Sequence, residues 1–558
     1  MKTVIIGGVA GGASAAARLR RLDEAAEIII LERGDYVSFA NCGLPYFIGG
    51  EISDRDELTL QTPESFRARF NIDVRVLSEA AEISPAEKRV TVREVQTGRT
   101  YEESYDTLIL SPGAEPVTPD IEGAHGENVF TLRNIPDADR IKAWIAQKSP
   151  RSAAVIGGGY IGVEMAENLV RAGLEVSIVE LADHLVAPLD ADMAADVHRY
   201  ARSKGISLHL GSGVGAICGR KVMLQNGGEL EADMVIMSVG VRPDTALARA
   251  CGVKLNARGS IVVNSRMQTS EKDIYAVGDA VEVRNFVTGE PAFIPLAGPA
   301  NRQGRIAADN ICGYESEYGG TQGSAVLKLF DMTVATTGLN EKAAAAAGID
   351  YDKTYTYSAS HASYYPGAEN MSVKALWDKK TLRLLGAQIV GYSGVDKRMD
   401  VLAAAIRLGA KVTDLASLEL CYAPPFGSAK DPVNMLGFVA ENVATGKLRQ
   451  FFWHDVESLP RDGSVTLLDV RTKTEVARGK IDGFINIPVD ELRERAYELP
   501  KGKPVYIHCH SGLRSYIACR MLGGRGYECH NLAGGWRLYE SVTSERSAIP
   551  EYICTECK

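Results

Sequence analysis

The sequence predicts an α/β fold built from several domains, and three observations predict it. Two units of strand, glycine-rich turn and helix begin at Val4 and Val155, and each is followed by a strand that ends in a glutamate. Units of this kind form parallel sheets that are covered by helices. A further series of strands and helices begins after about residue 455. The length of 558 residues, at about 150 residues per domain, is consistent with three or four domains.

The first unit has the pattern of a dinucleotide site. An apolar strand at 4–6 leads into Gly-Gly-Val-Ala-Gly-Gly at 7–12, and the next strand ends at Glu32. Glycines let backbone N–H groups approach a pyrophosphate at a helix N-terminus, and the acid accepts ribose hydroxyls. Val9 replaces the middle glycine of the G-x-G-x-x-G pattern, so a turn built only for packing is the alternative.

The second unit has all three fingerprint glycines, in Gly-Gly-Gly-Tyr-Ile-Gly at 157–162, and its next strand ends at Glu180. No arginine follows Glu180 directly to pair with a 2′-phosphate, which favours NADH over NADPH. Two such units imply two dinucleotides. Asp279, at the end of another strand, is then either a strand-end turn or a ligand for a flavin's ribityl chain, and the first unit favours the ligand.

On these motifs, residues 1 to about 445 resemble the flavin-dependent pyridine nucleotide-disulfide oxidoreductases. The resemblance implies two Rossmann-like domains, with the NADH-binding domain (112–254) inserted between the two parts of the FAD-binding domain (1–111 and 255–324). An α+β dimerisation domain (325–447) follows, which implies a homodimer. The implied FAD ligands are Gly7, Gly11, Gly12, Glu32 and Asp279. The implied NADH ligands are Gly157, Gly159, Gly162 and Glu180.

The segment 36–46 contains one cysteine, Cys42. Members of the superfamily with an internal disulfide carry two cysteines a few residues apart, so Cys42 cannot close a local disulfide. A single cysteine is usually an inert core residue. Here the neighbouring Gly, Pro and Asn, a predicted flavin and a helix start favour an exposed thiolate. That thiolate could cycle through a sulfenic acid or form a mixed disulfide with a small thiol.

The surroundings of Cys42 favour thiol chemistry. The related NADH peroxidases and oxidases have a histidine in the first glycine turn, where this chain has Ala10. The turn at 7–12 and Ser-Phe-Ala-Asn-Cys at 38–42 resemble those of the coenzyme A-disulfide reductases. Coenzyme A (CoA) is polyanionic and needs cations in an acidic protein, and two arginines lie three apart on the first predicted helix. The expected CoA contacts are Ser14, Arg18, Arg21, Ser38, Asn41 and Lys430.

The same resemblance implies tyrosines that the partner subunit contributes to the site. Tyr364, which we favour over its neighbour Tyr365, and Tyr422 occupy the matching segments. A phenol can hydrogen-bond or protonate a departing thiolate. Packing is the ordinary alternative for a tyrosine beside proline.

The segment 455–545 resembles a rhodanese domain, which has an α/β fold. Its loop at 509–514 (Cys-His-Ser-Gly-Leu-Arg) joins a predicted buried strand to a predicted helix, while Lys480 stands where rhodaneses commonly carry histidine. Backbone N–H groups at the helix start would frame an anionic sulfur and favour a persulfide on Cys509. Four residues separate Cys509 from Arg514, one fewer than in cysteine phosphatases, which suits sulfur rather than phosphate. The expected catalytic residues of this domain are Cys509 and Arg514. A degenerate domain that serves only as an interaction module is the alternative.

Composition excludes several other functions. The net charge is −9 and no basic stripe is present, which argues against general nucleic-acid binding. Neither a membrane-spanning apolar run nor a signal peptide is found, so we expect a cytoplasmic protein without membrane partners. The ten cysteines are too sparse for a disulfide framework. The tail (546–558) holds one C-x-x-C, Cys554 and Cys557, which is too few ligands for zinc, and no metal is predicted.

The sequence therefore predicts a homodimeric FAD enzyme that uses NADH to reduce CoA persulfide, polysulfide or CoA disulfide through Cys42, while Cys509 supplies sulfane sulfur. CoA is expected as substrate or as bound carrier. Two alternatives remain open. One is an NADH oxidase or peroxidase that uses a cysteine sulfenic acid. The other is a non-catalytic sulfur carrier or sensor.

Overall fold

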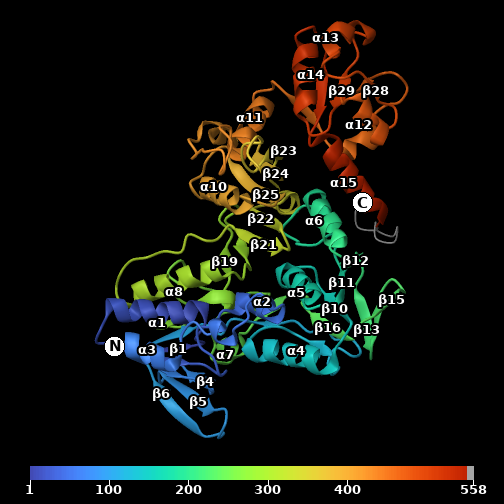
Figure 1. Ribbon diagram of the computed structural model, residues 1–558. Helices are drawn as coiled ribbons and strands as arrows, with labels where there is room; N and C mark the ends of the chain where they lie inside the picture. The colour runs from blue at the N-terminus through green and yellow to red at the C-terminus, as the bar shows by residue number, and fades with distance from the viewer. Residues whose placement is uncertain (549–558) are drawn as a thin grey trace. The chain divides into compact units, whose positions relative to one another are not determined.

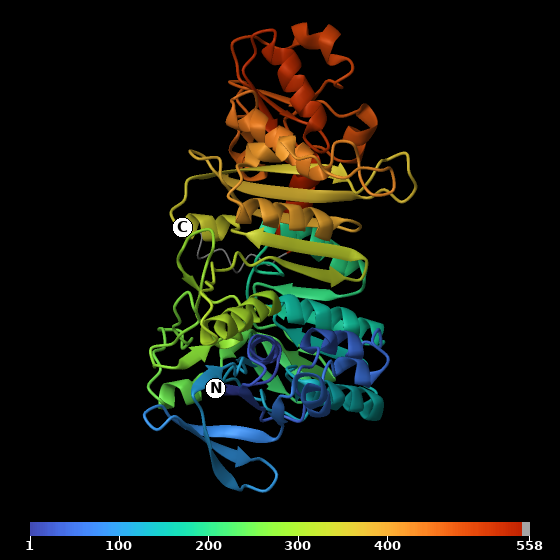
Figure 2. The ribbon, with the colours of Figure 1, turned by 90° about the vertical axis from the view of Figure 1, so that its left-hand side faces the viewer.

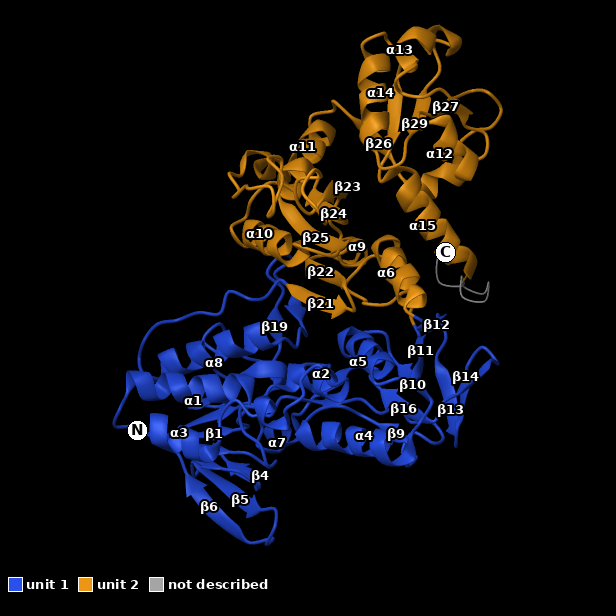
Figure 3. Cartoon of the chain, in the orientation of Figure 1, with its two compact units in different colours: residues 1–181, 205–323 blue, residues 182–204, 324–558 orange. Residues whose placement is uncertain are grey.

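The computed structural model describes residues 1–548 and divides into two compact units (Figure 3). The first comprises residues 1–181 and 205–323, and the second comprises 182–204 with the chain from 324 onward. Cys554 and Cys557 lie outside the described residues. No helix among residues 1–548 is both long enough and apolar enough to cross a membrane.

The first unit contains a parallel sheet in the order β18-β7-β1-β2-β3. Except for the edge strand Asp73–Arg75, its strands are almost continuously apolar, because both faces are covered. One face packs against helix residues, and the other packs against Ile83, Val90 and Val92 of a small antiparallel sheet. Helices α1 (Ala10–Leu22) and α8 (Ala297–Ile311) lie side by side against it (Figure 1). The strands are β1 (Lys2–Ile6), β2 (Glu27–Leu31), β3 (Asp73–Arg75), β7 (Thr107–Leu110) and β18 (Ile274–Ala276).

The second parallel sheet of this unit has the order β12-β11-β10-β16-β9. Two antiparallel strands, β8 (Ala114–Pro116) and β17 (Val241–Pro243), pair where the chain leaves the first sheet and returns to it. The sheet's strands are β9 (Val129–Phe130), β10 (Ser152–Ile156), β11 (Glu175–Glu180), β12 (Ser207–Leu210) and β16 (Met234–Met237).

Smaller elements complete the first unit. The antiparallel strands are β4 (Ser78–Ser84), β5 (Arg89–Glu94) and β6 (Thr100–Ser104), then β13 (Val214–Cys218), β14 (Lys221–Leu224) and β15 (Glu229–Glu231), and finally β19 (Val283–Arg284) and β20 (Pro291–Ala292). The remaining α-helices are α2 (Leu44–Ile48), α3 (Pro63–Phe70), α4 (Ile135–Lys148), α5 (Tyr160–Arg171) and α7 (Ala246–Ala250). The 3₁₀ turns are η1 (Asn41–Gly43), η2 (Arg55–Leu58) and η3 (Gly278–Ala280).

The second unit begins with an antiparallel sheet, β21-β22-β25-β24-β23, whose long strands are the yellow arrows of Figure 2. They are β21 (Ala325–Leu329), β22 (Met332–Gly338), β23 (Tyr351–Ala359), β24 (Asn370–Asp378) and β25 (Leu384–Gly391). The helices around this sheet are α6 (Ala191–Ser203), α9 (Glu341–Ala346), α10 (Val395–Arg407) and α11 (Pro432–Ala444), with the 3₁₀ turn η4 (Val412–Ser417).

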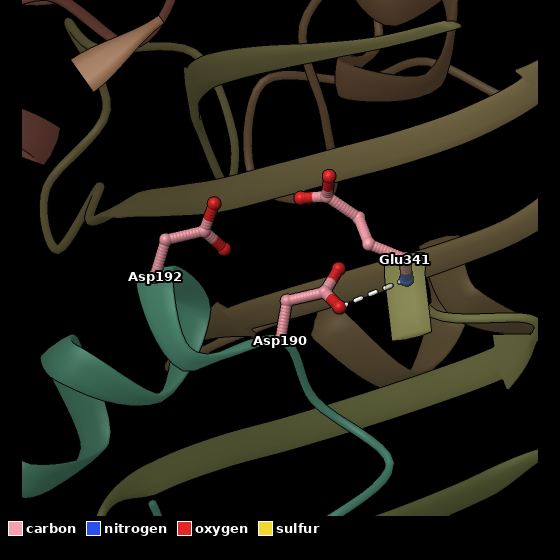
Figure 4. A group of neighbouring side chains, drawn as sticks. All are labelled: Asp190, Asp192 and Glu341. Carbon is pink, nitrogen blue, oxygen red and sulfur yellow. Dashed lines mark hydrogen bonds between the residues drawn. The ribbon is translucent and has the colours of Figure 1, made fainter. Parts of the chain in front are cut away.

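Buried charge explains why α6 belongs to this unit. Asp190, Asp192 and Glu341 point toward one another (Figure 4). The fully buried ammonium of Lys374 on β24 forms ion pairs with all three carboxylates, at 2.8 Å for Asp190 and Asp192. Leaving any of these charges buried and unpaired would be costly. Although the sequence placed 182–204 in the NADH-binding domain, this segment therefore packs with the antiparallel sheet.

A third parallel sheet, β26-β30-β29-β27-β28, confirms the predicted C-terminal α/β fold. Its strands are β26 (Arg449–Phe451), β27 (Thr466–Asp469), β28 (Ile485–Asn486), β29 (Val505–His508) and β30 (Cys529–Leu532). The helices are α12 (Lys473–Arg478), α13 (Leu492–Arg495), α14 (Leu513–Gly523) and α15 (Gly535–Ala548), with the 3₁₀ turns η5 (Trp453–Ser458) and η6 (Ala496–Glu498).

Candidate functional site

The first glycine turn lies at the carboxyl end of β1, as the sequence predicted. The residues implied as FAD ligands come together here: Gly7, Gly11 and Gly12 surround the start of α1, and Glu32 follows the adjacent strand β2. The Glu32 carboxylate accepts backbone N–H groups from Gly8 at 3.0 Å and Gly34 at 2.9 Å. The acid is therefore fixed beside the turn. Helix α1 begins without a side-chain cap, which leaves its first N–H groups to a ligand or water.

The second turn shows more directly that a ligand fits. A side chain at Gly162 would lie 1.9 Å from the Gly157 carbonyl oxygen, so that glycine is required for packing alone. A side chain at Gly159 would meet only open space. The fold itself therefore does not require the middle glycine, whereas a pyrophosphate lying on the backbone does. Glu180, at the end of β11, accepts the Gly158 N–H at 2.5 Å, so the acid predicted to bind the ribose is fixed beside this turn.

Asp279 lies in η3, just after β18, at the same sheet edge as the first turn. Burial raises the pKa of its carboxyl group, and the charge of Arg133 opposes that shift. A half-buried acid at the carboxyl end of a parallel strand suits a hydroxylated ligand chain. The residues present at both turns therefore fit the two dinucleotides.

Cys42 lies in the short turn η1 and is exposed, as predicted. Its Sγ contacts the side-chain oxygen of Asn41 at 3.6 Å. Burial of the thiol's surroundings raises the Cys42 pKa, and the carboxylates of Glu164 and Asp279 raise it further. The expectation that the local surroundings favour the thiolate is thus not met. The influence of Asp279 nevertheless puts Cys42 in the electrostatic field of the predicted flavin site.

Glu164 and Tyr46 are site residues that the sequence analysis missed. Tyr46 on α2, the helix after Cys42, donates its phenolic hydrogen to Glu164 Oε1 at 3.3 Å, and Glu164 lies on α5, directly after the second glycine turn. Burial raises the pKa of Glu164 to about 7, with the Tyr46 hydrogen bond opposing and Glu167 adding to the shift. Only the packing of α2 on α5 reveals this proximity.

The expected CoA contacts in the first unit lie on or near α1. Ser14 donates to Asn301 at 2.7 Å, and Arg18 forms an ion pair with Asp309 at 2.7 Å, so the Arg18 charge is already engaged. Arg21 is exposed at the end of the helix. Ser38 has a positive φ of 47° and its N–H bonds the Gly8 carbonyl, which ties the Cys42 loop to the first glycine turn.

The tyrosine loops belong to the second unit. The hydroxyls of Tyr364 and Tyr422 lie 3.0 Å apart, and both side chains are exposed. This hydrogen bond raises the pKa of Tyr364. Tyr365 instead packs its ring edge-on against His361. Of the two neighbours, Tyr364 is the one whose hydroxyl pairs with that of Tyr422, and its catalytic role stays a prediction. Lys430 is exposed just before α11.

Cys509 lies in the predicted sulfur-binding loop between β29 and α14, residues 509–514, which we call the cradle. Its Sγ accepts the Gly512 N–H at 3.1 Å and lies 3.2 Å from the Ser515 hydroxyl, a donor that the sequence analysis missed. Gly512 has a φ of +99°, which aims its N–H into the loop. A side chain at Gly535 would lie 2.7 Å from the Cys509 carbonyl oxygen, so glycine is needed there. The cysteine is fully buried.

Ion pairs hold this cradle in shape. Arg514 makes a two-pronged contact with Glu475 on α12, at 2.6 and 2.7 Å, and these bonds lower the Glu475 pKa to about 2. Below the loop, the buried pair of Asp469 and Arg471 closes at 2.7 Å. Burial lowers the pKa of His508 to about 4, so this histidine is neutral near pH 7. Arg514 is thus a structural clamp in addition to its predicted place at the sulfur loop.

Comparison with known proteins gives consistent matches along the chain. Residues 1–304 match the pyridine nucleotide-disulphide oxidoreductase family, 324–432 its dimerisation domain, and 453–541 the rhodanese-like domain. A coenzyme A disulfide reductase of Staphylococcus epidermidis is 36% identical over 441 residues, which cover 79% of this chain and 100% of that protein.

Two solved structures cover nearly the whole chain. The structure of reduced Bacillus anthracis CoADR-RHD has a TM-score of 0.96 at 51% identity and covers 98% of each chain. The structure of an NAD-dependent persulfide reductase from A. fulgidus has a TM-score of 0.91 at 37% identity, covering 97% of this chain and 100% of that one.

Proposed function

The chain belongs to the pyridine nucleotide-disulphide oxidoreductase family, and on that premise we propose that it reduces CoA persulfide, polysulfide or CoA disulfide with NADH. The family depends on FAD and NAD(P)H, and the dimerisation domain implies a homodimer. The rhodanese-like domain supplies sulfane sulfur to this reaction. The proposal extends to this chain what the relatives are named for.

The two glycine turns hold the cofactors. Gly7, Gly11 and Gly12, with Glu32 and Asp279, bind FAD. Gly157, Gly159 and Gly162, with Glu180, bind NADH. Bound there, FAD would supply the redox chemistry that links NADH oxidation to reduction of the sulfur on Cys42. Glu180 selects NADH because its carboxylate accepts ribose hydroxyls and repels a 2′-phosphate.

Cys42 performs the sulfur chemistry. Attack of its thiolate on the outer sulfur of a CoA persulfide gives a Cys42 persulfide and free CoA, while attack on the inner sulfur gives a Cys42–CoA disulfide and hydrosulfide. The net reaction is CoA–S–SH + NADH + H⁺ → CoA–SH + H₂S + NAD⁺. Tyr364 and Tyr422 of the partner subunit stabilise the departing thiolate, since paired phenols can donate to it. Ser14, Arg21, Ser38, Asn41 and Lys430 bind CoA, with Arg18 as a positioning residue paired to Asp309.

Cys509 accepts sulfane sulfur and passes it to CoA. The N–H of Gly512 and the hydroxyl of Ser515 are arranged to stabilise an anionic persulfide. A plain disulfide reductase has no use for such a cradle. The presence of the cradle is therefore our reason for proposing a persulfide, rather than CoA disulfide alone, as the physiological substrate.

One observation carries the proposal: an exposed cysteine without a local cysteine partner lies in a loop that the Ser38 N–H ties to the first glycine turn, in a chain that also holds the Gly512 and Ser515 donors around Cys509. Ala10, in place of a histidine, removes the proton donor that the NADH oxidase and peroxidase alternative needs.

The test is anaerobic NADH turnover with CoA persulfide, CoA disulfide and polysulfide. Cys42→Ser should abolish all three activities, whereas Cys509→Ser should selectively lose polysulfide use. Cys218→Ser, which changes an exposed cysteine on β13, is the matched control and should behave as wild type. Trapping and mass analysis of Cys42 distinguish persulfide from CoA disulfide.

The alternatives make different predictions in the same assay. An oxidase or peroxidase would turn over faster with oxygen or hydrogen peroxide than with CoA persulfide. A carrier or sensor would show negligible steady-state NADH oxidation with every sulfur acceptor, and partner binding unchanged by Cys42→Ser. Either result would overturn the reductase proposal.

A further inference from the structure

A cavity of about 750 Å³ lies in the domain that carries the second glycine turn. Its walls come from the end of α4, from the hairpin of β13 and β14, and from the segments just before β9, β10 and β16 (Figure 3). Those three strands are neighbours in the parallel sheet, so the cavity lies at their amino-terminal edge. The glycine turn lies at the opposite edge, beyond the five residues of β10, which is about 15 Å at roughly 3.3 Å per residue. The cavity is therefore separate from the predicted NADH site.

Asp233 holds the wall segments of this cavity together. Its carboxylate accepts the backbone N–H of Arg151 at 2.7 Å and pairs with the Arg220 guanidinium at 2.6 Å. The side-chain amide of Asn128 donates to the backbone carbonyls of Gly219 and Asp233, at 3.0 and 3.3 Å. The negative charge of Asp233 is thus compensated within the protein, and the walls are fixed without a ligand.

Two cations that line the cavity have no such compensation. Within residues 1–548, the Lys148 ammonium and the Arg151 guanidinium form no ion pair and no side-chain hydrogen bond. The Lys148 ammonium lies 5.3 Å from the centre of the Trp144 ring, and this cation–π contact restrains its position. The three basic and two acidic side chains of the lining leave one net positive charge, in a chain whose net charge is −9. The cavity therefore favours an anion.

We propose that this cavity binds a pyrophosphate group, either free or carried by a small molecule such as a nucleoside diphosphate. Lys148 and Arg151 flank the short turn between α4 and β10, and each holds one phosphoryl group through charge-assisted hydrogen bonds. The volume lies within the roughly 300–1,000 Å³ of small-molecule sites and leaves room for a carried group against Pro150 and Ile217. The site goes beyond the proposed reductase function, since it uses neither glycine turn and no cysteine.

The test is isothermal titration calorimetry of the full-length, FAD-loaded protein with inorganic pyrophosphate, uridine diphosphate and uridine, in the absence of divalent metal ions. Saturating NAD⁺ and CoA occupy the predicted dinucleotide and CoA sites, and the uracil probes contain no adenine that could compete there. We expect pyrophosphate and uridine diphosphate to bind at one site per chain, and uridine, which has no phosphate, not to bind. Lys148→Ala and Arg151→Ala should each weaken binding of both phosphates about tenfold.

Two further variants test the electrostatic argument. Glu127→Gln removes the lining acid that no basic side chain pairs with among residues 1–548, so it should tighten binding of pyrophosphate about two- to fivefold. Lys221→Ala removes an exposed lysine of the same domain that pairs with Glu229 at 3.0 Å outside the cavity. It is the matched control for the loss of one positive charge and should bind as wild type.

Tryptophan fluorescence locates the bound phosphate. Because Lys148 lies against the Trp144 ring, pyrophosphate should change the emission of the wild type. Trp144→Phe should still bind pyrophosphate but lose this change. The proposal is overturned if neither phosphate binds the wild type, if Lys148→Ala and Arg151→Ala bind as tightly as the wild type, or if Lys221→Ala loses as much affinity as they do.

Discussion

The Ser515 hydroxyl offers the sharpest test of the sulfur cradle. It lies 3.2 Å from Cys509 Sγ, and the Gly512 N–H lies 3.1 Å from the same sulfur. Ser515→Ala removes one of these two donors without adding volume. A hydrogen bond to a charged group contributes about 1.5–3 kcal/mol, and about 1.4 kcal/mol corresponds to a tenfold change. Formation of the Cys509 persulfide should therefore slow by about 10- to 150-fold.

The assay is sulfur transfer from polysulfide to cyanide, with single-turnover persulfide formation on Cys509 followed by mass spectrometry. Ser511→Ala, in the same loop, is the matched control and should retain wild-type rates. NADH-dependent reduction of CoA disulfide should be unchanged in both variants, which shows that the reductase domains are intact. Equal rates for Ser515→Ala and wild type, or an equal loss in Ser511→Ala, would refute the role given to this hydroxyl.

Three further predictions concern other parts of the chain. Glu164→Gln removes a carboxylate that raises the Cys42 pKa, so the pH midpoint of Cys42 alkylation should move to lower pH; an unchanged or higher midpoint would contradict this. Lys374→Met leaves buried carboxylates unpaired, and urea unfolding at pH 7 should show a loss of about 3–5 kcal/mol. Burial raises the pKa of Glu341, but Lys374 helps to lower it from 4.5 to about 2. The stability that this ion pair contributes is therefore complete above pH 4.5 and is lost as the pH falls toward 2. The difference in unfolding free energy between wild type and Lys374→Met should shrink over the same range. Gly159→Ala should raise the KM for NADH by about tenfold with an unchanged melting temperature, because its side chain would meet only open space.

Short sequence patterns predicted the turns and loops that make up the site. Side chains that reach these loops from distant segments were found only in the structure. The glycine turns, the acids after them and the loop at Cys509 are set by spacing along the chain, so the sequence located them. Glu164 acts on Cys42 from 122 positions later, because α5 packs on α2. Lys374 draws α6 into the second unit through Asp192, 182 positions away in the chain. A sequence pattern carries no signal for such pairs.

Cys509 and Cys42, the two proposed sulfur centres, have different neighbours, and from these we infer a direction of sulfur transfer. At Cys509 the neighbours are hydrogen-bond donors, the Gly512 N–H and the Ser515 hydroxyl. Such donors would stabilise the negative charge of a Cys509 persulfide. At Cys42 the carboxylates of Glu164 and Asp279 raise the thiol pKa. A thiolate of higher pKa is the stronger nucleophile and the poorer leaving group. We therefore expect Cys509 to hold sulfane sulfur as a persulfide, CoA to accept that sulfur, and Cys42 to attack the resulting CoA persulfide. A persulfide formed on Cys42 should then not transfer its sulfur back to Cys509.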